Sequence, residues 1–493
     1  MINVDESQRD LQRIVWKNSK SEEVKTYRLC TVTYGTTSAP YLAMRCLKQL
    51  NVDGEQQYPK ASTIVKSDFY MDDVLTGAAD LETAKDLKGE IIELLGSCGM
   101  HLHKWCGNHP ELIDKSSDAD CYDFDKLGDT KTLGLLWKSQ NDVFAFNLSC
   151  EDQPKVTKRT VLSKIARIFD PLGLLGPIVT KAKILLQRLW KLQVDWDESL
   201  PKKETEEWLR FIHALKKISN VYVDRYVLTE TPVVKTIVGF SDDSECAYGA
   251  CVYIVSSNAR NSSCSKLLCS KSRVAPIKTI TVPRLELCAA VLLAKLVTKV
   301  LRVLNLMDNL IYLYSDSTIV LAWLQRSPCE LKTFVASRVA TIQRLTDINH
   351  WFHVKSEENA ADLVSRGLDP EQLIDNDFWF NGPPFLKQDT PNFPFDHENV
   401  ELDDESYLKE IKCLTVENQP TIVFIHNLES KDNRLTGVLT SKEICDAEIL
   451  VIKAAQVSLN DKCKTKRAAS MSLYAASLHN NSMASYVQAS YAN

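Results

Sequence analysis

The stretch Val233–Ser241, VVKTIVGFS, is followed at once by Asp242 and decides the fold of the second half of the chain. It is an apolar run of strand length that ends at an acid. Residues 233–367 then continue, in order, as two further strands, a helix, a strand, two helices, a strand and a helix. The clearest of these elements are Ala247–Ser256, Pro283–Val303, Leu310–Ser315 and Trp351–Val354. Strands mixed with helices in this order predict an α/β layer fold with a mixed sheet.

Four acids stand at the ends of these elements. Asp242 and Asp316 follow strands, Glu286 lies in the first turn of the long helix, and Asp362 opens the last helix. An α/β fold gathers a site at such places. Phosphodiester hydrolysis needs an activated water and neutralisation of charge, which two Mg²⁺ ions about 4 Å apart supply. Four carboxylates packed without metal would repel one another. The alternative is unrelated surface or helix-capping acids, which are normal near helix starts.

Five motifs around these acids resemble the ribonuclease H domain of BEL/Pao-type retrotransposon polyproteins. They are Gly239–Ser244, Ala247–Ala250, Pro283–Leu287, Tyr314–Ser317 and Asn359–Gly367. The resemblance implies that Asp242, Glu286, Asp316 and Asp362 are the catalytic, metal-binding residues, with Mg²⁺ as the cofactor and Mn²⁺ as a substitute. It also implies cleavage of the RNA strand of an RNA–DNA hybrid. Asp243 stands where the family usually has a small residue, and it is an alternative ligand.

Three more residues near the motifs are candidates for an auxiliary role. His353 lies nine residues before Asp362 and could assist proton transfer or product release, or be a strand histidine bonded to the backbone. Arg284 and Arg366 flank the acids and could hold phosphates. Solvated or ion-paired arginines are the alternative for both.

A second acidic motif, Tyr70-Met71-Asp72-Asp73, lies between the predicted strands Ile64–Tyr70 and Val74–Thr76. Such a hairpin presents carboxylates at its tip, and phosphoryl transfer needs oxygens of this kind to hold Mg²⁺. The run FYMDDVLTG resembles the palm motif of reverse transcriptases, which implies Asp72 and Asp73 as catalytic metal ligands. The alternative is a plain acidic turn.

The neighbours of this turn resemble the same palm. Tyr34–Tyr41 resembles the segment beneath nucleotide and template, and Leu102–Asn108 resembles the segment that leads to the primer grip. A primed RNA template is the implied partner, with Tyr70, Met71, Lys104 and Trp105 as nucleic-acid contacts. Core packing is the alternative for Trp105, and a zinc site the alternative for His101, His103, Cys106 and His109. The family's third palm aspartate lies upstream of the segment that Ile2–Trp16 resembles, so we expect defective polymerisation.

Residues 151–230 are predicted to form a basic helical connection. Between Lys155 and Lys191 there are nine Lys and Arg residues against one acid, Asp170. The helices Thr160–Phe169 and Ile178–Lys191 flank the turn DPLGLLGP, and Leu200–Ser219 is a further helix. Residues 154–200 resemble a segment named as the Pao retrotransposon peptidase, but the Asp-Thr/Ser-Gly turn of an aspartic protease is absent from the sequence. We expect Lys158 and Arg159 to contact phosphates of the hybrid; a solvated helix face is the alternative.

The whole chain of 493 residues thus reads as an α/β and α+β multidomain protein. The expected segments are a partial reverse-transcriptase palm and thumb at 1–150, the connection at 151–230, a ribonuclease H-like mixed-sheet domain at 231–370, a linker at 371–435, a truncated integrase-like start at 436–460 and a disordered tail at 461–493.

The bulk composition is that of an ordinary globular chain. The fifteen cysteines include no C-x-x-C pair, which argues against a zinc ribbon and a disulfide scaffold. The absence of a long apolar run argues against a membrane partner. The net charge of −5 does not exclude nucleic-acid work, because local basic patches matter more than the sum. We expect an intracellular protein, in a cytoplasmic particle or the nucleus, with other proteins of the element as further partners. The competing hypothesis is a non-catalytic, nucleic-acid-binding remnant of a transposable element.

Overall fold

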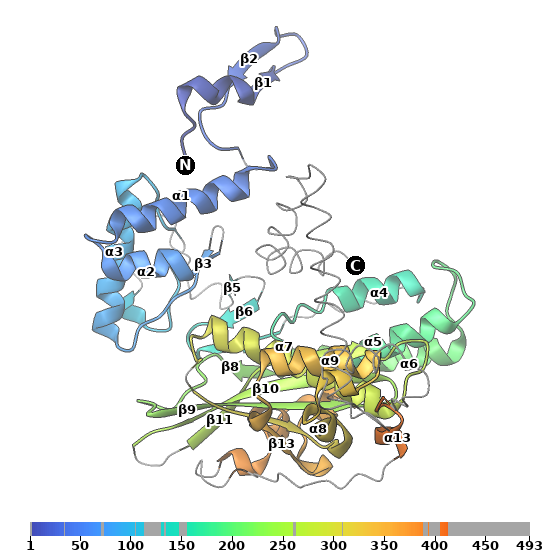
Figure 1. Ribbon diagram of the computed structural model, residues 1–493. Coiled ribbons are helices and arrows are strands. Elements are labelled where there is room, and N and C mark those ends of the chain that lie inside the picture. The colour runs from blue at the N-terminus through green and yellow to red at the C-terminus, as the bar shows by residue number, and fades with distance from the viewer. Residues whose placement is uncertain are drawn as a thin grey trace, which may run out of the picture. The chain divides into compact units, whose positions relative to one another are not determined.

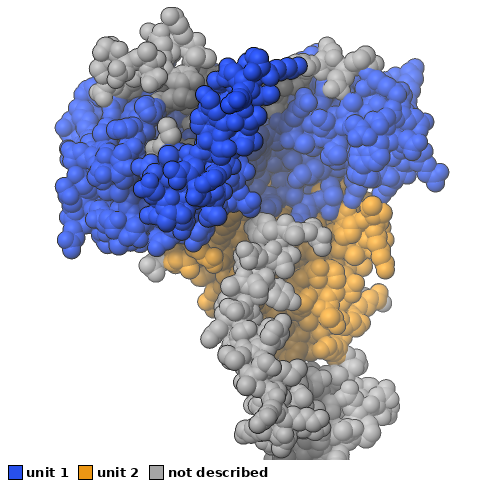
Figure 2. Space-filling view, turned by 90° about the horizontal axis from the view of Figure 1, so that it is seen from above, with its two compact units in different colours: residues 1–236, 253–274, 363–392 blue, residues 237–252, 275–362, 393–493 orange. Residues whose placement is uncertain are grey.

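The computed structural model describes residues 2–33, 35–70, 73–103, 105–112, 130–132, 135–146, 155–259, 263–307, 309–387, 393 and 405–412 (Figure 1). Contacts divide the chain into two compact units, coloured in Figure 2. Unit 1 comprises Met1–Thr236, Tyr253–Val274 and Leu363–Asn392, and unit 2 comprises Ile237–Val252, Ala275–Asp362 and Phe393–Asn493. Across the described ranges we find no helix with the length and apolar character of a membrane span.

The N-terminal part of unit 1 holds a small helical core (Figure 1). It is built by α1 (Ala39–Gly54), α2 (Pro59–Ser67) and α3 (Leu81–Ser97). Leu87, Ile91, Leu94 and Leu95 recur in α3 with helical spacing, and all four side chains are buried in this core. The described turn and strands around this core are η1 (Glu6–Gln12), β1 (Arg13–Trp16), β2 (Lys25–Arg28), β3 (Phe69–Tyr70) and β4 (Asp73–Val74).

The strand predicted for Ile64–Tyr70 is wrong up to Ser67, where the chain is helical. The run Thr63-Ile64-Val65 has β-branched side chains and suggests a strand from propensity alone. However, Pro59 opens a helix whose Ala61 and Val65 are buried in the same core as α3. Tertiary packing of this apolar face therefore overrides the local preference.

A four-stranded antiparallel sheet lies in unit 1, in the order β5-β6-β7-β8. Its strands are β5 (Thr130–Thr132), β6 (Leu135–Lys138), β7 (Val143–Ala145) and β8 (Tyr222–Asp224). Strand β8 comes from the predicted helical connection, and Arg225 just after it binds Asp142 with Nε 2.5 Å from Oδ1. The end of the connection is thus part of this sheet.

The rest of the connection is helical, as predicted. It forms α4 (Lys158–Ala166), α5 (Gly176–Lys191), α6 (Lys202–Leu215) and the short turn η3 (Lys216–Asn220). Unit 1 also contains α11 (Pro370–Leu373), α12 (Asp377–Asn381) and η7 (Pro384–Lys387), where a linker was expected from residue 371. These turns are ordered because Trp379 is fully buried and its Nε1 donates to the carbonyl of Leu174 at 2.8 Å.

The turn between α4 and α5 packs tightly on strand β11 (Ser263–Val274). Gly173 has φ +75°, and a Cβ at this position would overlap the carbonyl oxygen of Ser270. The hydroxyl of Ser270 donates to the carbonyl of Gly173, and its amide donates to the carbonyl of Leu172 at 2.9 Å. One helical turn after Gly176, Thr180 donates to the hydroxyl of Ser272 at 2.6 Å. The glycine at 173 is therefore required both by its backbone conformation and by this close approach.

A five-stranded sheet has the order β11-β10-β9-β12-β13. Its other strands are β9 (Val234–Asp243), β10 (Ala247–Ser257), β12 (Leu310–Ser315) and β13 (Trp351–His353). Strands β12 and β13 are parallel, whereas the three-residue connection between β9 and β10 permits only antiparallel pairing. The sheet is therefore mixed, and the predicted order of strands and helices is confirmed.

The helices that follow these strands are α7 (Val282–Val303), α8 (Thr318–Leu324), α9 (Thr333–Leu345) and α10 (Asp362–Arg366). Helix α7 buries Leu285, Ala289, Leu293 and Val297, an apolar stripe with helical spacing. Short 3₁₀ turns occur at η2 (Pro110–Leu112), η4 (Pro328–Glu330), η5 (Ile348–His350) and η6 (Ser356–Glu358).

Part of the acidic segment predicted as linker is bound to unit 2. It forms α13 (Glu405–Leu408) and then a β-bridge between Ile411 and Leu331. The amide of Lys332 donates to the carbonyl of Glu410 at 2.8 Å, and that of Lys412 donates to the carbonyl of Glu330 at 2.8 Å. The predicted segments 436–460 and 461–493 lie outside the described residues.

Candidate active site

The four predicted acids and Asp243 all belong to unit 2. Asp242 and Asp243 are the last two residues of β9, and Asp316 directly follows β12. Glu286 lies in the first turn of α7, and Asp362 is the first residue of α10. Strands β9 and β12 are neighbours in the sheet. Oγ of Ser241 donates to the carbonyl of Tyr314 at 3.3 Å, so Asp242 and Asp316, which follow these residues closely, lie at the same end of the sheet.

Asn359 forms hydrogen bonds to the ends of β9 and β12 and to the start of α10. Its Nδ2 donates to Oδ1 of Asp316 at 3.2 Å and to the carbonyl of Ser241 at 3.1 Å. Its Oδ1 accepts the amide of Ala361, and its carbonyl accepts the amide of Asp362 at 3.0 Å. Sequence reasoning did not assign Asn359 a role. A buried amide between two acid-bearing elements can be recognised only when the elements are placed in space.

Two serine hydroxyls orient the acids. Ser356 donates to Oδ2 of Asp316 at 2.7 Å, and Ser317 donates to Oε2 of Glu286 at 2.5 Å. Burial raises the pKa of Glu286, the hydrogen bond from Ser317 opposes this rise, and the charge of Asp316 adds to it. Glu286 and Asp316 therefore act on each other electrostatically, as members of one site.

Asp243 is part of the same group of charges. Burial raises its pKa to about 8, and the charges of Glu286, Asp242 and Asp316 act in the same direction. Its Oδ2 is buried without a hydrogen-bond partner among the described residues. Asp243 thus faces the acids rather than solvent, and its role as an alternative ligand stays a prediction.

The chemistry of the donors suits a divalent cation, although the arrangement is not a finished metal site. In the described ranges, no three His, Cys, Asp or Glu side chains stand so as to hold an ion. The donors are nevertheless all carboxylates, which Mg²⁺ prefers. Their mutual repulsion and the unpartnered Oδ2 of Asp243 are what a cation would relieve.

The auxiliary candidates have different surroundings. His353 is half-buried at the end of β13 and pairs with Ser315, the residue before Asp316. Arg284 is bound by Glu410, with Nη2 2.7 Å from Oε1, and its guanidinium lies 4.8 Å from the ring centre of Phe334. Arg366 ends α10. An ion-paired arginine was the alternative for Arg284, and this is what the structure has.

The polymerase-like turn is described only in part. Tyr70 and Asp73 are paired across β3 and β4, and both are exposed. Met71, Asp72 and Lys104 lie outside the described residues. Trp105 is half-buried, and the ammonium of Lys88 lies 5.1 Å from its ring centre. His101, His103, Cys106 and His109 lie in the described ranges, and no three of them are placed so as to hold a metal ion.

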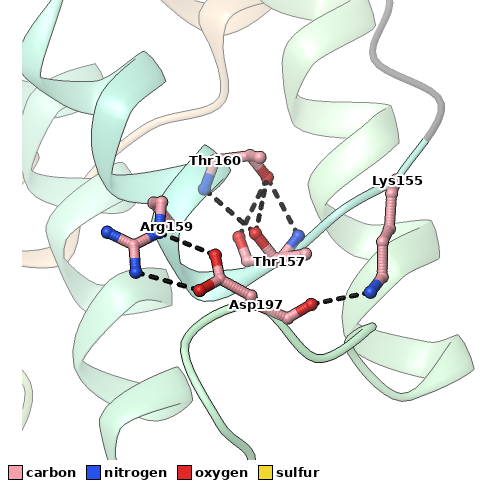
Figure 3. Close-up of polar contacts among 5 residues, drawn as sticks. All are labelled: Lys155, Thr157, Arg159, Thr160 and Asp197. Carbon is pink, nitrogen blue, oxygen red and sulfur yellow. Dashed lines mark hydrogen bonds and ion pairs between the residues drawn. The ribbon is translucent and has the colours of Figure 1, made fainter.

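Lys158 and Arg159 are both bound within unit 1, and Figure 3 shows the pairing of Arg159 with Asp197. The side chain of Lys158 is buried, and its Nζ donates to the carbonyl of Leu192 at 2.8 Å. Arg159 donates from Nε and Nη2 to the two carboxylate oxygens of Asp197 at 2.6 and 2.9 Å. Both cations fasten the start of α4 to the segment after α5. A count of charges cannot reveal such partners, since Asp197 lies outside the basic stretch.

Part of the chain is similar to a known protein family. Residues 157–317, about a third of the chain, match the family described as the Pao retrotransposon-like RNaseH-like domain. The match includes α4 and α5 together with β9 to β12, so the helical connection and four strands of the sheet are together similar to an RNase H-like domain. No curated protein matches the chain.

Two solved structures are similar to parts of the chain. The N-terminal RNase H domain of Rv2228c from Mycobacterium tuberculosis, fused to maltose-binding protein, is 14% identical with a TM-score of 0.19, covering 27% of this chain and 93% of that one. The protease–reverse transcriptase of prototype foamy virus is 15% identical with a TM-score of 0.20, covering 72% of this chain and 41% of that one.

Proposed function

We propose that this chain is a nuclease of the ribonuclease H type that hydrolyses the RNA strand of RNA–DNA hybrids. The observation that carries the proposal is that hydrogen bonds from Asn359 and Ser317 hold Asp316 and Glu286 beside the end of β9. The charges of Asp242, Asp243, Glu286 and Asp316 act on one another there. Asp362 would complete the group from the start of α10. The match of residues 157–317 to a Pao retrotransposon-like RNaseH-like domain supports the same function.

In this proposal, Asp242, Glu286, Asp316 and Asp362 would hold two Mg²⁺ ions, with Mn²⁺ as a substitute. When bound, the ions supply an activated water and charge neutralisation at the phosphate. The chain's own residues position the ligands: Asn359 and Ser356 fix the two oxygens of Asp316, and Ser317 fixes Oε2 of Glu286. His353, next to Ser315 in the sheet, is the candidate for proton transfer after cleavage.

The test is cutting of an end-labelled RNA–DNA hybrid by the purified chain with and without Mg²⁺. Glu286→Gln keeps the shape of the side chain and should lower the cutting rate at least about 100-fold, since a metal ligand contributes several kcal/mol. Glu357→Gln is the matched control, because Glu357 is exposed in the neighbouring turn η6, and it should cut within about twofold of the wild type. Equal rates for the two variants would contradict the assignment.

A second candidate is a remnant that binds nucleic acid without cutting. The lack of a finished metal arrangement among the described residues favours it. Binding of the hybrid by the wild-type chain, without Mg²⁺-dependent cutting, is its expected outcome. The polymerase-like turn is assigned no activity in either case, and nucleotide incorporation on a primed RNA template measures this directly.

A further inference from the structure

Lys183 of helix α5 is close enough to Lys271 and Arg273 of strand β11, within unit 1, for their charges to act on it. The register of this contact is fixed by Gly176 against Ser270 and by Thr180 against Ser272. Lys183 is one turn further along α5, so it lies beside the end of β11. Lys271 and Arg273 occupy the exposed positions between and after the buried Ser270 and Ser272. We call Lys183, Lys271 and Arg273 the α5–β11 cation surface.

The charges of this surface are poorly balanced by the protein itself. Burial lowers the pKa of Lys183. The positive charges of Lys271 and Arg273 lower this pKa further, whereas the negative charge of Asp170 raises it. Among the described residues, Asp170 is the one acid that acts on Lys183, and both of its carboxylate oxygens already accept backbone amides, from Leu174 at 2.9 Å and Leu175 at 2.7 Å. Neither Lys271 nor Arg273 has an ion pair with any described carboxylate.

Protection of a sheet edge explains only part of this arrangement. Strand β11 is the edge strand of the five-stranded sheet, and exposed Lys and Arg on such a strand prevent pairing with other chains. That purpose is served by Lys271 and Arg273 alone. It does not account for Lys183, whose half-buried ammonium is placed next to two like charges at a cost in free energy. An anion bound from outside would offset this cost.

We propose that the α5–β11 cation surface binds the phosphate backbone of a nucleic acid. Cations at alternate positions of a strand are roughly 6.6 Å apart, a regular spacing that suits successive phosphates. All three residues lie within the region that matches an RNaseH-like domain, which favours nucleic acid over an acidic protein. The inference rests on the proposed function for its substrate, an RNA–DNA hybrid, and assigns that substrate a contact outside the carboxylate group.

The test compares two double variants of the full chain. Lys271→Ala with Arg273→Ala removes two cations of the surface. Lys203→Ala with Arg210→Ala is the matched control: it removes one Lys and one Arg that are exposed on α6. Binding of a fluorescein-labelled RNA–DNA hybrid is measured by anisotropy in EDTA at several KCl concentrations, with thermal melting to show that each variant is folded.

The surface variant should bind more weakly, and its slope of log affinity against log salt should fall by about one for each phosphate that the protein no longer neutralises, about two in all. The control should keep the wild-type slope. Equal slopes in the surface variant and the wild type, or an equal decrease in the control, would overturn the proposal. So would displacement of the hybrid from the wild type, but not from the surface variant, by low concentrations of poly-glutamate, which would indicate an acidic protein partner. Since EDTA prevents cutting, failure here is separate from failure of the nuclease assay.

Discussion

The hydroxyl oxygen of Ser317 donates a hydrogen bond to Oε2 of Glu286 at 2.5 Å and accepts the backbone amide of Val320 at 3.2 Å. One side chain therefore caps helix α8 and orients an acid on helix α7. The capping contact alone is a common feature of helix starts. Its combination with Glu286 ties the stability of α8 to the geometry of the candidate site.

Ser317→Ala should lower both stability and cutting. Loss of the cap costs about 1 kcal/mol of unfolding free energy, and Glu286 loses the bond that lowers its pKa. Ser317→Thr, which keeps the hydroxyl, should restore most of both. The measurements are urea unfolding and the cutting rate in Mg²⁺. Ser337→Ala, at an exposed serine of α9, is the control and should change stability by no more than about 0.5 kcal/mol. Equal effects at the two serines would refute this role.

Glu410→Gln should destabilise unit 2. The carboxylate of Glu410 is mostly buried and binds a largely shielded Arg284, so loss of the charge leaves the guanidinium without its partner. We expect a loss of about 1–3 kcal/mol in the urea unfolding of the chain. The control is Glu371→Gln, which breaks the exposed pair with Lys217 and should cost less than about 1 kcal/mol. A smaller effect at Glu410 than at Glu371 would contradict the prediction.

Gly173→Ala should weaken the contact between the α4–α5 turn and β11. The new methyl group would overlap the Ser270 carbonyl, and the positive φ is unfavourable for alanine, so we expect a loss above about 2 kcal/mol. Gly89→Ala is the control, because a Cβ there meets no atom within 4 Å in the middle of α3. That change should stabilise the chain by up to about 1 kcal/mol. Calorimetric melting distinguishes the two, and an unchanged melting temperature in the Gly173→Ala variant would show that the turn moves freely.

The metal-free chain should lose stability as the pH rises. The pKa of Asp243 is about 8 in the folded protein against an ordinary value of 3.8, so folding takes up a proton between about pH 4 and pH 8. Stability contributed by the protonated form is present below this window and is lost across it. Asp243→Asn should flatten the decline, whereas Glu357→Gln should not. Urea unfolding in EDTA from about pH 5 to pH 8 measures the slopes, and parallel slopes for wild type and Asp243→Asn would contradict the prediction.

Much of the sheet and its acids could be predicted from local sequence. Apolar runs such as Leu310–Ser315 have the length and bounds of a strand, and an acid after each run marks the strand end whatever lies around it. The same is true of α3, whose apolar spacing fits a helix and is buried as expected. The prediction succeeded where the apolar pattern of a single element determined whether it formed a strand or a helix.

What could not be predicted depends on partners distant in sequence. Residues 63–65 have the side chains of a strand, but packing against α3 stabilises them as a helix. The cations Lys158 and Arg159 look free until Leu192 and Asp197 are placed beside them. Asn359 looks like an ordinary polar residue until Ser241 and Asp316 lie on either side of it. In each case, the decisive contact joins segments whose approach no local pattern encodes.

The fit of Gly173 and Gly176 against Ser270 also bears on how this region can be inherited. A recombination event that transferred the sheet from residue 231 onward would leave behind the turn that covers Ser270 and Ser272, and with it the acceptor for the indole of Trp379. The recipient would gain every carboxylate of the site on a scaffold with an uncovered strand. The smallest piece that can be exchanged between chains with this strand still covered therefore begins before Gly173.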